Sequence, residues 1–426
     1  YSSPRKIKPG LKREDCFPFL RELIDRVHLM YPHVKLVLGG QGLQTYTFYQ
    51  EFKEELDCWI RGLGEDSILK FVRNEESGIE NPPIIEDVSS SMFDFHNQKN
   101  VFNEQDHIFP HEVLPLAISR GCRFKCKFCT YPLLGRKPSE DYIRSEDSIY
   151  SELMYNYDNF STTSYMFTDD TFNETTEKIE MLCRVQNKLK INIKFSSYLR
   201  VDLLHAHKEQ IPLLHEAGLN TCHFGLESFN HESAKAIGKG LRKEKVKETL
   251  HLCKEIWGDD VLTNGGFITG LPYETPDTMD VWCQELFDEE YPLDTWYLTT
   301  LAFMNRGKDV DAYPYSSAFE KDPAKYGYTF EDASEDEPTN WNNGSFTKKS
   351  AIKFAESWRE KWKEKIKVGS WHAMGLQSYN IYDEFHWEDI RKLKRHHLIY
   401  PSEGLTERLN GLKKRYIKDY WNRVSI

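Results

Sequence analysis

The sequence lacks the long apolar runs that a membrane protein needs. No stretch approaches the roughly 18 uninterrupted apolar residues that cross a bilayer. The N-terminus has no charged segment followed by an apolar one, which a secretory signal would show. These absences predict a cytoplasmic protein with no membrane partner. The chain begins with Tyr1 rather than Met, so we expect it to lack its natural start.

An excess of basic charge is also missing. The 56 Lys and Arg are outnumbered by 67 Asp and Glu, which gives a net charge of −11. A general nucleic-acid binder needs a basic surface to neutralise phosphates, so a nucleic-acid partner is not expected. Residues 351–426 carry 16 basic and 10 acidic residues. A solvated helix face explains that local excess better than a partner surface does.

The cysteines do not form the pattern of a disulfide framework. Their number, nine, is odd, and without a secretory signal we expect reduced thiols. Three of them lie close together and need a separate explanation. The other six are scattered along the chain, at Cys16, Cys58, Cys183, Cys222, Cys253 and Cys283.

What is present indicates an α/β protein of two or three domains, because domains average roughly 150 residues and the chain has 426. At the N-terminus a helix over 14–30 precedes strands at 34–38 and 57–61, and a glycine turn follows each strand. This is the rhythm of a Rossmann-like sheet, of which only a part fits into residues 1–75. The polar residues 76–112 are predicted to be a linker.

The next segment, residues 113–310, alternates strands with amphipathic helices. Such alternation predicts a (βα)6 partial TIM barrel, with functional groups at the carboxyl ends of its strands. A mostly helical segment, 311–426, follows and is expected to cap the barrel or hold substrate. Its aromatic residues are interpreted as packing. The six expected barrel strands cover 114–119, 164–168, 192–197, 220–224, 262–268 and 295–303.

The three clustered cysteines, Cys122, Cys126 and Cys129, follow the first barrel strand directly. Soft thiolate sulfur selects zinc or an iron-sulfur cluster. A zinc knuckle would want a fourth Cys or His at fixed spacing, and none stands close by. With three ligands, a cubane would keep one iron free for a small molecule.

This CxxxCxxC loop resembles the signature of the radical S-adenosylmethionine (SAM) superfamily. The resemblance covers about 114–290. It implies that the three cysteines bind an oxygen-sensitive 4Fe-4S cluster whose free iron holds SAM. Electron transfer from a donor such as flavodoxin or ferredoxin would cleave SAM to methionine and a 5′-deoxyadenosyl radical that abstracts hydrogen from a substrate.

The same resemblance assigns SAM contacts on the following strands. Phe128 would approach the adenine, and the acidic pair Asp169 and Asp170 would hold the amino group. Arg200 would pair with the SAM carboxylate. Each of these residues also has a simpler explanation. Phe128 could serve packing alone, the acidic pair could cap the next helix, and Arg200 could form a salt bridge with Asp202.

Further contacts are implied on the fourth and fifth strands. Glu227 and Ser228 match a Gly-x-Glu-Ser ending whose Glu contacts the ribose. The adenine segment of the family is matched by Gly266, Ile268 and Gly270.

No catalytic residue is assigned by the resemblance, but two side chains are pocket candidates. Period-two alternation places His223 on the same strand face as Glu227, so His223 would point into the barrel. Tyr198 lies two residues before Arg200, at the end of the third strand. His223 is either a proton-handling group or a core histidine. Cys222, on the opposite face, is expected to be a buried, inert thiol.

The N-terminal segment resembles the last part of the cobalamin-binding domain of many radical SAM methyltransferases. Gly39 and Gly40 would then pass beside the cobalamin nucleotide tail. The usual Asp-x-His-x-x-Gly loop and the earlier strands are absent. Either the chain begins after them, or the domain is degenerate and holds no cobalamin.

The resulting function hypothesis is a radical SAM enzyme acting on an unactivated C–H bond of a peptide or small molecule. Cobalamin-dependent methyl transfer is the leading reaction. The alternatives are a cobalamin-independent epimerisation, rearrangement or bond cleavage, and a non-catalytic iron-sulfur electron-transfer module. A tRNA methylthiotransferase would need three more clustered cysteines, and the N-terminal part supplies only two, far apart.

Overall fold

The computed structural model describes residues 17–39, 55–62, 64–73, 84–87, 94–131, 134–135, 142–303, 316–330, 340–399 and 402–424. These residues belong to two compact units. Of the described residues, those up to Asp94 together with Ser316 form the first unit, and those of 95–303 and 317–424 form the second. Gly40 lies outside the described residues.

The first unit contains a sheet of three parallel strands in the order β1-β2-β3. The predicted helix and two strands are present, and a second helix follows β2. A small core of Cys58, Ile60, Val37 and Phe71 joins the strands to this second helix. β3 lies in the segment predicted to be a linker, where its short Ile-Ile-Glu-Asp run carries too little periodicity to be recognised. The elements are α1 (Phe17–Met30), β1 (Val37–Gly39), β2 (Cys58–Gly62), α3 (Glu65–Val72) and β3 (Ile84–Asp87).

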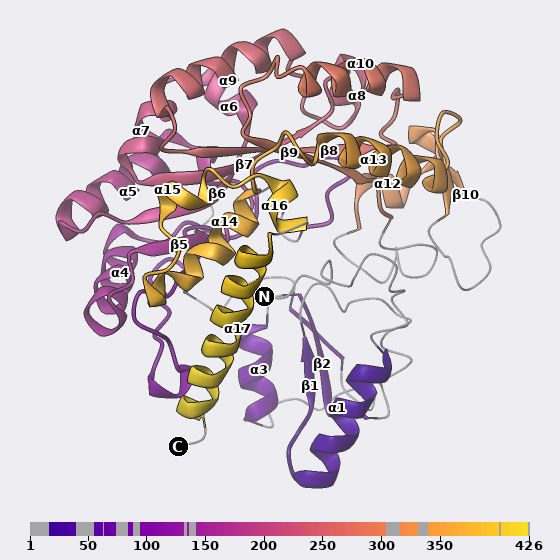
Figure 1. Cartoon of the computed structure of the whole chain (residues 1–426). Helices are drawn as coiled ribbons and strands as arrows, with labels where there is room; N and C mark the ends of the chain where they lie inside the picture. Colours follow the sequence, from indigo (N-terminus) through magenta and orange to yellow (C-terminus); the bar gives the residue numbers. More distant parts are fainter. Residues whose placement is uncertain are drawn as a thin grey trace. The chain divides into compact units, whose positions relative to one another are not determined.

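The second unit is built on six parallel strands that neighbour one another in sequence order, which confirms the predicted partial barrel. Helices follow the strands and lie along the outside of the sheet (Figure 1). The strands are β4 (Leu114–Leu116), β5 (Ser164–Phe167), β6 (Lys194–Leu199), β7 (Leu219–Glu227), β8 (Leu262–Thr269) and β9 (Thr295–Thr300). The helices are α4 (Glu146–Phe160), α5 (Thr176–Leu189), α6 (Val201–Ala206), α7 (Gln210–Glu216), α8 (His231–Ala236), α9 (Lys243–Trp257) and α10 (Pro276–Phe287).

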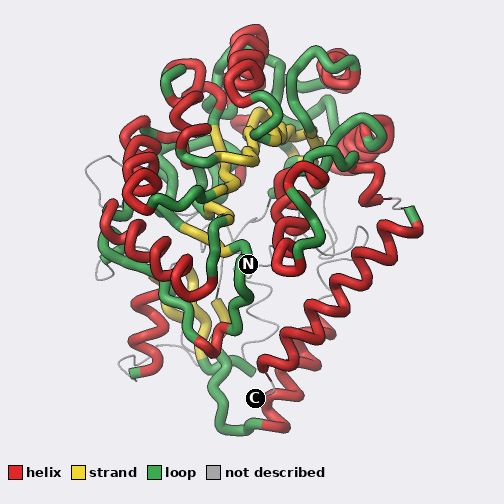
Figure 2. Tube along the Cα trace, turned by 60° about the vertical axis from the view of Figure 1, so that its left-hand side comes forward, coloured by secondary structure: helices red, strands yellow, loops and turns green. Residues whose placement is uncertain are grey.

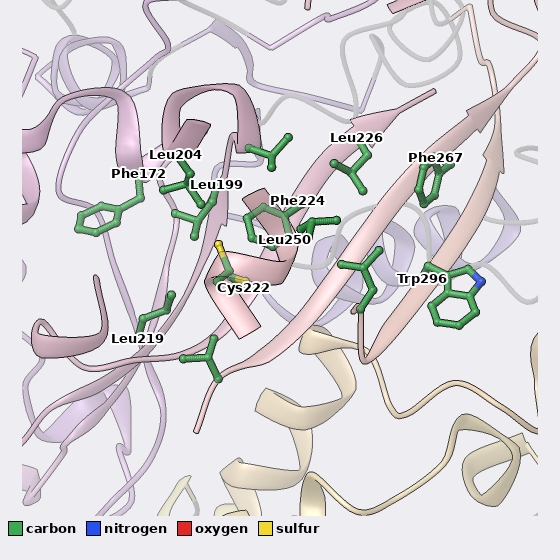
Figure 3. Close-up of a cluster of buried hydrophobic side chains, with 14 of the residues drawn as sticks. Phe172, Leu199, Leu204, Leu219, Cys222, Phe224, Leu226, Leu250, Phe267 and Trp296 are labelled. Carbon is green, nitrogen blue, oxygen red and sulfur yellow. The ribbon is translucent and has the colours of Figure 1, made fainter. Parts of the chain in front are cut away.

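The core lies between the strands and these outer helices. Figure 3 shows Cys222, Phe224 and Leu226 along one strand, with Leu250 of α9 beside them. Cys222 is completely buried, and burial raises the pKa of its thiol well above the usual value. It is therefore a packing residue, as the strand alternation predicted.

A helical segment follows the barrel, as predicted. α13 packs against β9, and its Trp358 and Trp362 are buried in the same core as the barrel strands. α17 runs as one long helix to the end of the described chain (Figure 2). Within the described residues, no helix is long and apolar enough to span a bilayer. The elements are α12 (Ala318–Lys321), β10 (Thr329–Phe330), β11 (Trp341–Asn342), α13 (Lys348–Trp362), α14 (Ser370–Gln377), α15 (Trp387–Ile390), α16 (Arg395–Ile399) and α17 (Glu403–Val424).

Candidate active site

The cysteine loop leaves the carboxyl end of β4 and is held by backbone hydrogen bonds from distant segments. The N–H of Lys127 donates to the carbonyl of Ile237 at 3.1 Å, and the carbonyl of Lys127 accepts from the N–H of Phe319, also at 3.1 Å. α8 and α12 therefore fix the middle of the loop from two sides. Close to the first cysteine, the N–H of Gly135 donates to the carbonyl of Cys122 at 2.6 Å.

The three thiols of this loop are free. Burial, with a smaller contribution from Cys126 and Asp170, raises the pKa of Cys129 to about 12, and burial likewise raises the pKa of Cys122. Both are therefore thiols until a metal displaces their protons.

No three metal-binding side chains in the described part of the chain lie close enough to share one ion. A cubane makes no such demand, because each thiolate binds a different iron. The donor set thus fits a 4Fe-4S cluster.

The predicted acidic pair is divided by the structure, because Asp169 is already fully engaged. Its Oδ2 accepts from the N–H of Ile118 at 2.9 Å, and its Oδ1 accepts from Ser119 Oγ at 2.6 Å. The ammonium of Lys178 lies 2.6 Å from the same Oδ1 and 3.1 Å from Glu174, with all three side chains buried. Asp169 therefore ties the end of β4 to the end of β5.

Asp170 lies beside the cysteine loop instead. Burial, assisted by the neighbouring Asp169 charge, raises its pKa to about 7. Its carboxylate in turn raises the pKa of Cys122 and of Cys129, although burial contributes more to both. A cation brought to this position would favour the ionised form of Asp170.

Arg200, at the end of β6, also contacts the cysteine loop. Its NH1 donates to the sulfur of Cys126 at 3.2 Å, and its Nε and NH2 form a fork on Asp202 at 3.0 and 2.6 Å. The salt bridge to Asp202 is thus present. Burial alone would lower the pKa of the guanidinium, but the hydrogen bonds to Asp202 and Cys126 outweigh it and raise the pKa.

At the end of β7, Glu227 has a positive φ of 66° and pairs with Lys239 at 3.1 Å. The strand register shifts between Gly225 and Glu227, which interrupts the simple alternation used to place Glu227 and His223 on one face.

Ser228 next to it donates to the buried carboxylate of Glu274. Burial raises the pKa of Glu274, although hydrogen bonds from Ser228 and Thr278 oppose the rise. Ser228 therefore joins the β7 end to the loop before α10.

The two predicted adenine glycines face protein side chains. A Cβ on Gly266 would lie 2.9 Å from Nε2 of His223, and one on Gly270 would lie 2.1 Å from the indole of Trp341. Gly270 also has a φ of +91°. Glycine at 266 makes room for His223, and glycine at 270 makes room for the C-terminal segment. Ile268 and Phe128 are half-buried and pack against the barrel core.

His223 lies inside the barrel in a polar row that crosses neighbouring strands. Its Nδ1 is 2.7 Å from the amide nitrogen of Asn264, and its Nε2 is 3.3 Å from the hydroxyl of Tyr297. Tyr198, the strand neighbour of His223, packs edge-on against its ring at 4.9 Å. The indole of Trp371 follows 5.8 Å from Tyr198, and these rings line a small cavity.

Sequence reasoning missed several residues of this arrangement, namely Lys178, Glu174, Asn173, Lys239, Glu274, Asn264, Tyr297 and Trp341. Most lie on helices or loops outside the recognised motifs. Lys178 had one available signal, because a lysine on an apolar helix face is rarely buried without acidic partners.

The comparison with known proteins adds the family. The sequence model of the Radical SAM superfamily matches residues 116–286. The barrel is a radical SAM domain. Such a domain uses a 4Fe-4S cluster and SAM, acts on a substrate and needs a reductant.

Relatives of the radical SAM domain are distant. An uncharacterised methyltransferase of Pyrococcus horikoshii is 25% identical over 253 residues, which cover 58% of this chain and 52% of the relative. The anaerobic magnesium-protoporphyrin IX monomethyl ester cyclase of Cereibacter sphaeroides is 23% identical over 320 residues, covering 67% and 50%. The chain thus spans about half the length of the curated relatives it matches.

One solved structure with the same fold is the radical SAM methyltransferase TsrM of Kitasatospora setae, bound to tryptophan and a SAM analogue. The match has a TM-score of 0.52 at 15% identity, and covers 75% of this chain and 64% of that chain. At this identity the match shows a shared fold and no more than that.

Proposed function

We propose that this protein is a radical SAM enzyme that transfers a methyl group to an unactivated carbon with the help of cobalamin. The observation that carries the proposal is the position of the thiols of Cys122, Cys126 and Cys129, in one anchored loop beside Asp170 and Arg200. These three thiolates would hold a 4Fe-4S cluster, which would supply the electron for the cleavage of SAM to methionine and a 5′-deoxyadenosyl radical. The electron would come from a flavodoxin or ferredoxin.

The contacts of the side chains refine the assignment of SAM contacts. Asp170 is the acid proposed to hold the SAM amino group, because both oxygens of Asp169 are occupied by Ile118, Ser119 and Lys178. Phe128, Glu227 and Ile268 remain proposed contacts of the adenosine.

The proposed roles of the remaining residues change with their contacts. Ser228 acts by positioning, through Glu274. Gly266 and Gly270 act by giving room to His223 and Trp341.

The proposed substrate site is the barrel interior at Tyr198 and His223. His223 can handle a proton there, because Asn264 can offer either its N–H or its oxygen to Nδ1 and so accommodates both imidazole tautomers. The ring hydroxyl of Tyr297 extends this polar row from the opposite side. The proposed substrate is a small molecule or a peptide.

The N-terminal unit supports the cobalamin part of the proposal. Its three strands are parallel, and Gly39 stands at the carboxyl end of β1, the edge where open parallel sheets bind ligands. Gly40 is proposed to join it. The relative from Pyrococcus is named a methyltransferase, and a second TsrM structure contains cobalamin and a 4Fe-4S cluster.

A second candidate is a radical modification without cobalamin. The relative from Cereibacter is named a cyclase rather than a methyltransferase. Ring closure, rearrangement or epimerisation would need only the cluster, SAM and the barrel pocket.

The first experiment tests SAM cleavage. Full-length protein is reconstituted anaerobically with iron and sulfide, reduced, and assayed for cluster absorbance and 5′-deoxyadenosine. We expect Cys126→Ala to lose both signals, whereas Cys183→Ala, a thiol on the outer helix α5, should keep them. Absence of SAM cleavage in the wild type, with and without candidate substrates, would refute the enzyme proposal.

The second experiment decides between the two reactions. Purified protein is mixed with hydroxocobalamin, passed through a desalting column and examined by its visible spectrum. Retained cobalamin at one equivalent is expected for methyl transfer. Release of all cobalamin, together with intact SAM cleavage, would favour the cobalamin-independent candidate.

A further inference from the structure

Arg200 contacts a cysteine sulfur as well as an acid. Its NH1 donates to Cys126 Sγ at 3.2 Å, while Nε and NH2 are both engaged by Asp202. The ring of Phe124, from the cysteine loop, lies 4.0 Å from the guanidinium carbon. Arg200 is only 6% exposed, so its charge acts in a region from which water is largely excluded.

The backbone of Arg200 is fixed as firmly as its side chain. Its N–H donates to Asn173 Oδ1 at 2.8 Å, and its carbonyl accepts from Asn173 Nδ2 at 3.0 Å. Asn173 is itself fully buried and also donates to Gln210 at 3.2 Å. This clamp holds the start of the side chain in place, so little reorganisation is needed to keep NH1 on the sulfur.

A cation that donates to a cluster sulfur affects the electron affinity of the cluster. Reduction adds negative charge that spreads onto the sulfurs, and a hydrogen bond from a charged group stabilises that charge. The guanidinium stays protonated at any physiological pH. Asp202 carries the opposite charge and accepts from the other two nitrogens of the guanidinium, Nε and NH2, so it opposes the effect of the cation on the sulfur.

We propose that Arg200 sets the reduction potential of the cluster through its hydrogen bond to Cys126, with Asp202 as the group that limits this effect. The inference rests on the proposed function in one respect, that Cys126 binds the cluster. It gives Arg200 a role before SAM arrives, in addition to any pairing with the SAM carboxylate. Arg200 is then a positioning residue, because its charge acts on the iron through the sulfur of Cys126 and not by direct contact.

The test is a redox titration of the reconstituted full-length protein without SAM, followed by electron paramagnetic resonance of the reduced cluster. Arg200→Gln removes the charge and the fork. Arg184→Gln is the matched control, because Arg184 makes an exposed salt bridge on α5. At the potential that reduces half of the wild-type clusters, we expect the reduced-to-oxidised ratio to fall at least threefold in R200Q and to stay unchanged in R184Q.

Asp202→Asn provides an independent measurement that keeps Arg200 in place. With the opposing charge removed, the ratio should rise at least threefold at the same potential. This variant decides the question if R200Q fails to retain its cluster.

The outcomes separate this inference from the proposed function. A wild type that forms no cluster contradicts the proposed function. If R200Q forms a normal cluster and its reduced-to-oxidised ratio stays within threefold of the ratio in R184Q, the inference is wrong. The same holds if R200Q weakens SAM binding but leaves the potential of the SAM-free cluster unchanged, since Arg200 would then act on SAM alone.

Discussion

The buried ammonium of Lys178 should stabilise the barrel at the carboxyl ends of β4 and β5, the edge from which the cysteine loop leaves. Its Nζ lies 2.5 Å from Ser119 Oγ, 2.6 Å from Asp169 and 3.1 Å from Glu174, and the side chains of the three charged residues are completely buried. Lys178→Met keeps most of the volume but removes the cation that pairs with both buried carboxylates. Removing one partner of a buried ion pair costs about 3–5 kcal/mol, chiefly because the remaining charge stays desolvated.

This loss should be visible in thermal unfolding. For domains of this size each kcal/mol lowers the melting temperature by about 2–4 °C, so K178M should melt roughly 6–20 °C below the wild type. Lys188→Met is the matched control, since Lys188 lies on the same helix in an exposed pair with Asp147. It should cost no more than about 1 kcal/mol.

A K178M protein that melts within 2 °C of K188M at pH 8 would refute the reasoning.

Two glycines give further predictions from their surroundings. Gly270→Ala should destabilise the barrel by about 2–4 kcal/mol, because the new Cβ would overlap the Trp341 indole at 2.1 Å in addition to straining a positive φ. Gly327→Ala is the control, because Gly327 shares the positive φ but a Cβ there would meet nothing within 4 Å. It should cost only about 1 kcal/mol. Equal melting temperatures for G270A and G327A would contradict the packing account. Gly266→Ala should displace His223, whose Nε2 would lie 2.9 Å from the new methyl group, and lower product formation at least tenfold while 5′-deoxyadenosine formation persists. Unchanged coupling of product to 5′-deoxyadenosine would show that the position of His223 does not matter.

The order of the elements could be predicted from the sequence because it depends on local patterns. The repeated change between period-two and helical spacing predicted the barrel, and the spacing of Cys122, Cys126 and Cys129 predicted the metal centre. β3 escaped prediction because four residues without flanking signals contain too little pattern, and its strand character comes from pairing with β2.

The roles of individual site residues were less predictable, because they depend on partners far away in the sequence. Asp169 and Asp170 are neighbours of the same type, and only the approach of Lys178 from α5 separates a structural acid from one that faces the cysteine loop. Gly270 matched a family position in sequence, yet the side chain that fills its space comes from Trp341, 71 residues later.

Taken alone, the sequence determined the class of fold and predicted the chemistry of the cysteine loop, since both follow from residue spacing over short stretches of chain. The tertiary structure decided which charged groups are already paired. It decided that Arg200 points at a cysteine sulfur, and that His223 shares the barrel interior with Asn264 and Tyr297. The physical reason is that burial and charge pairing arise when strands and helices distant in sequence pack together, and no local pattern encodes which side chains then meet.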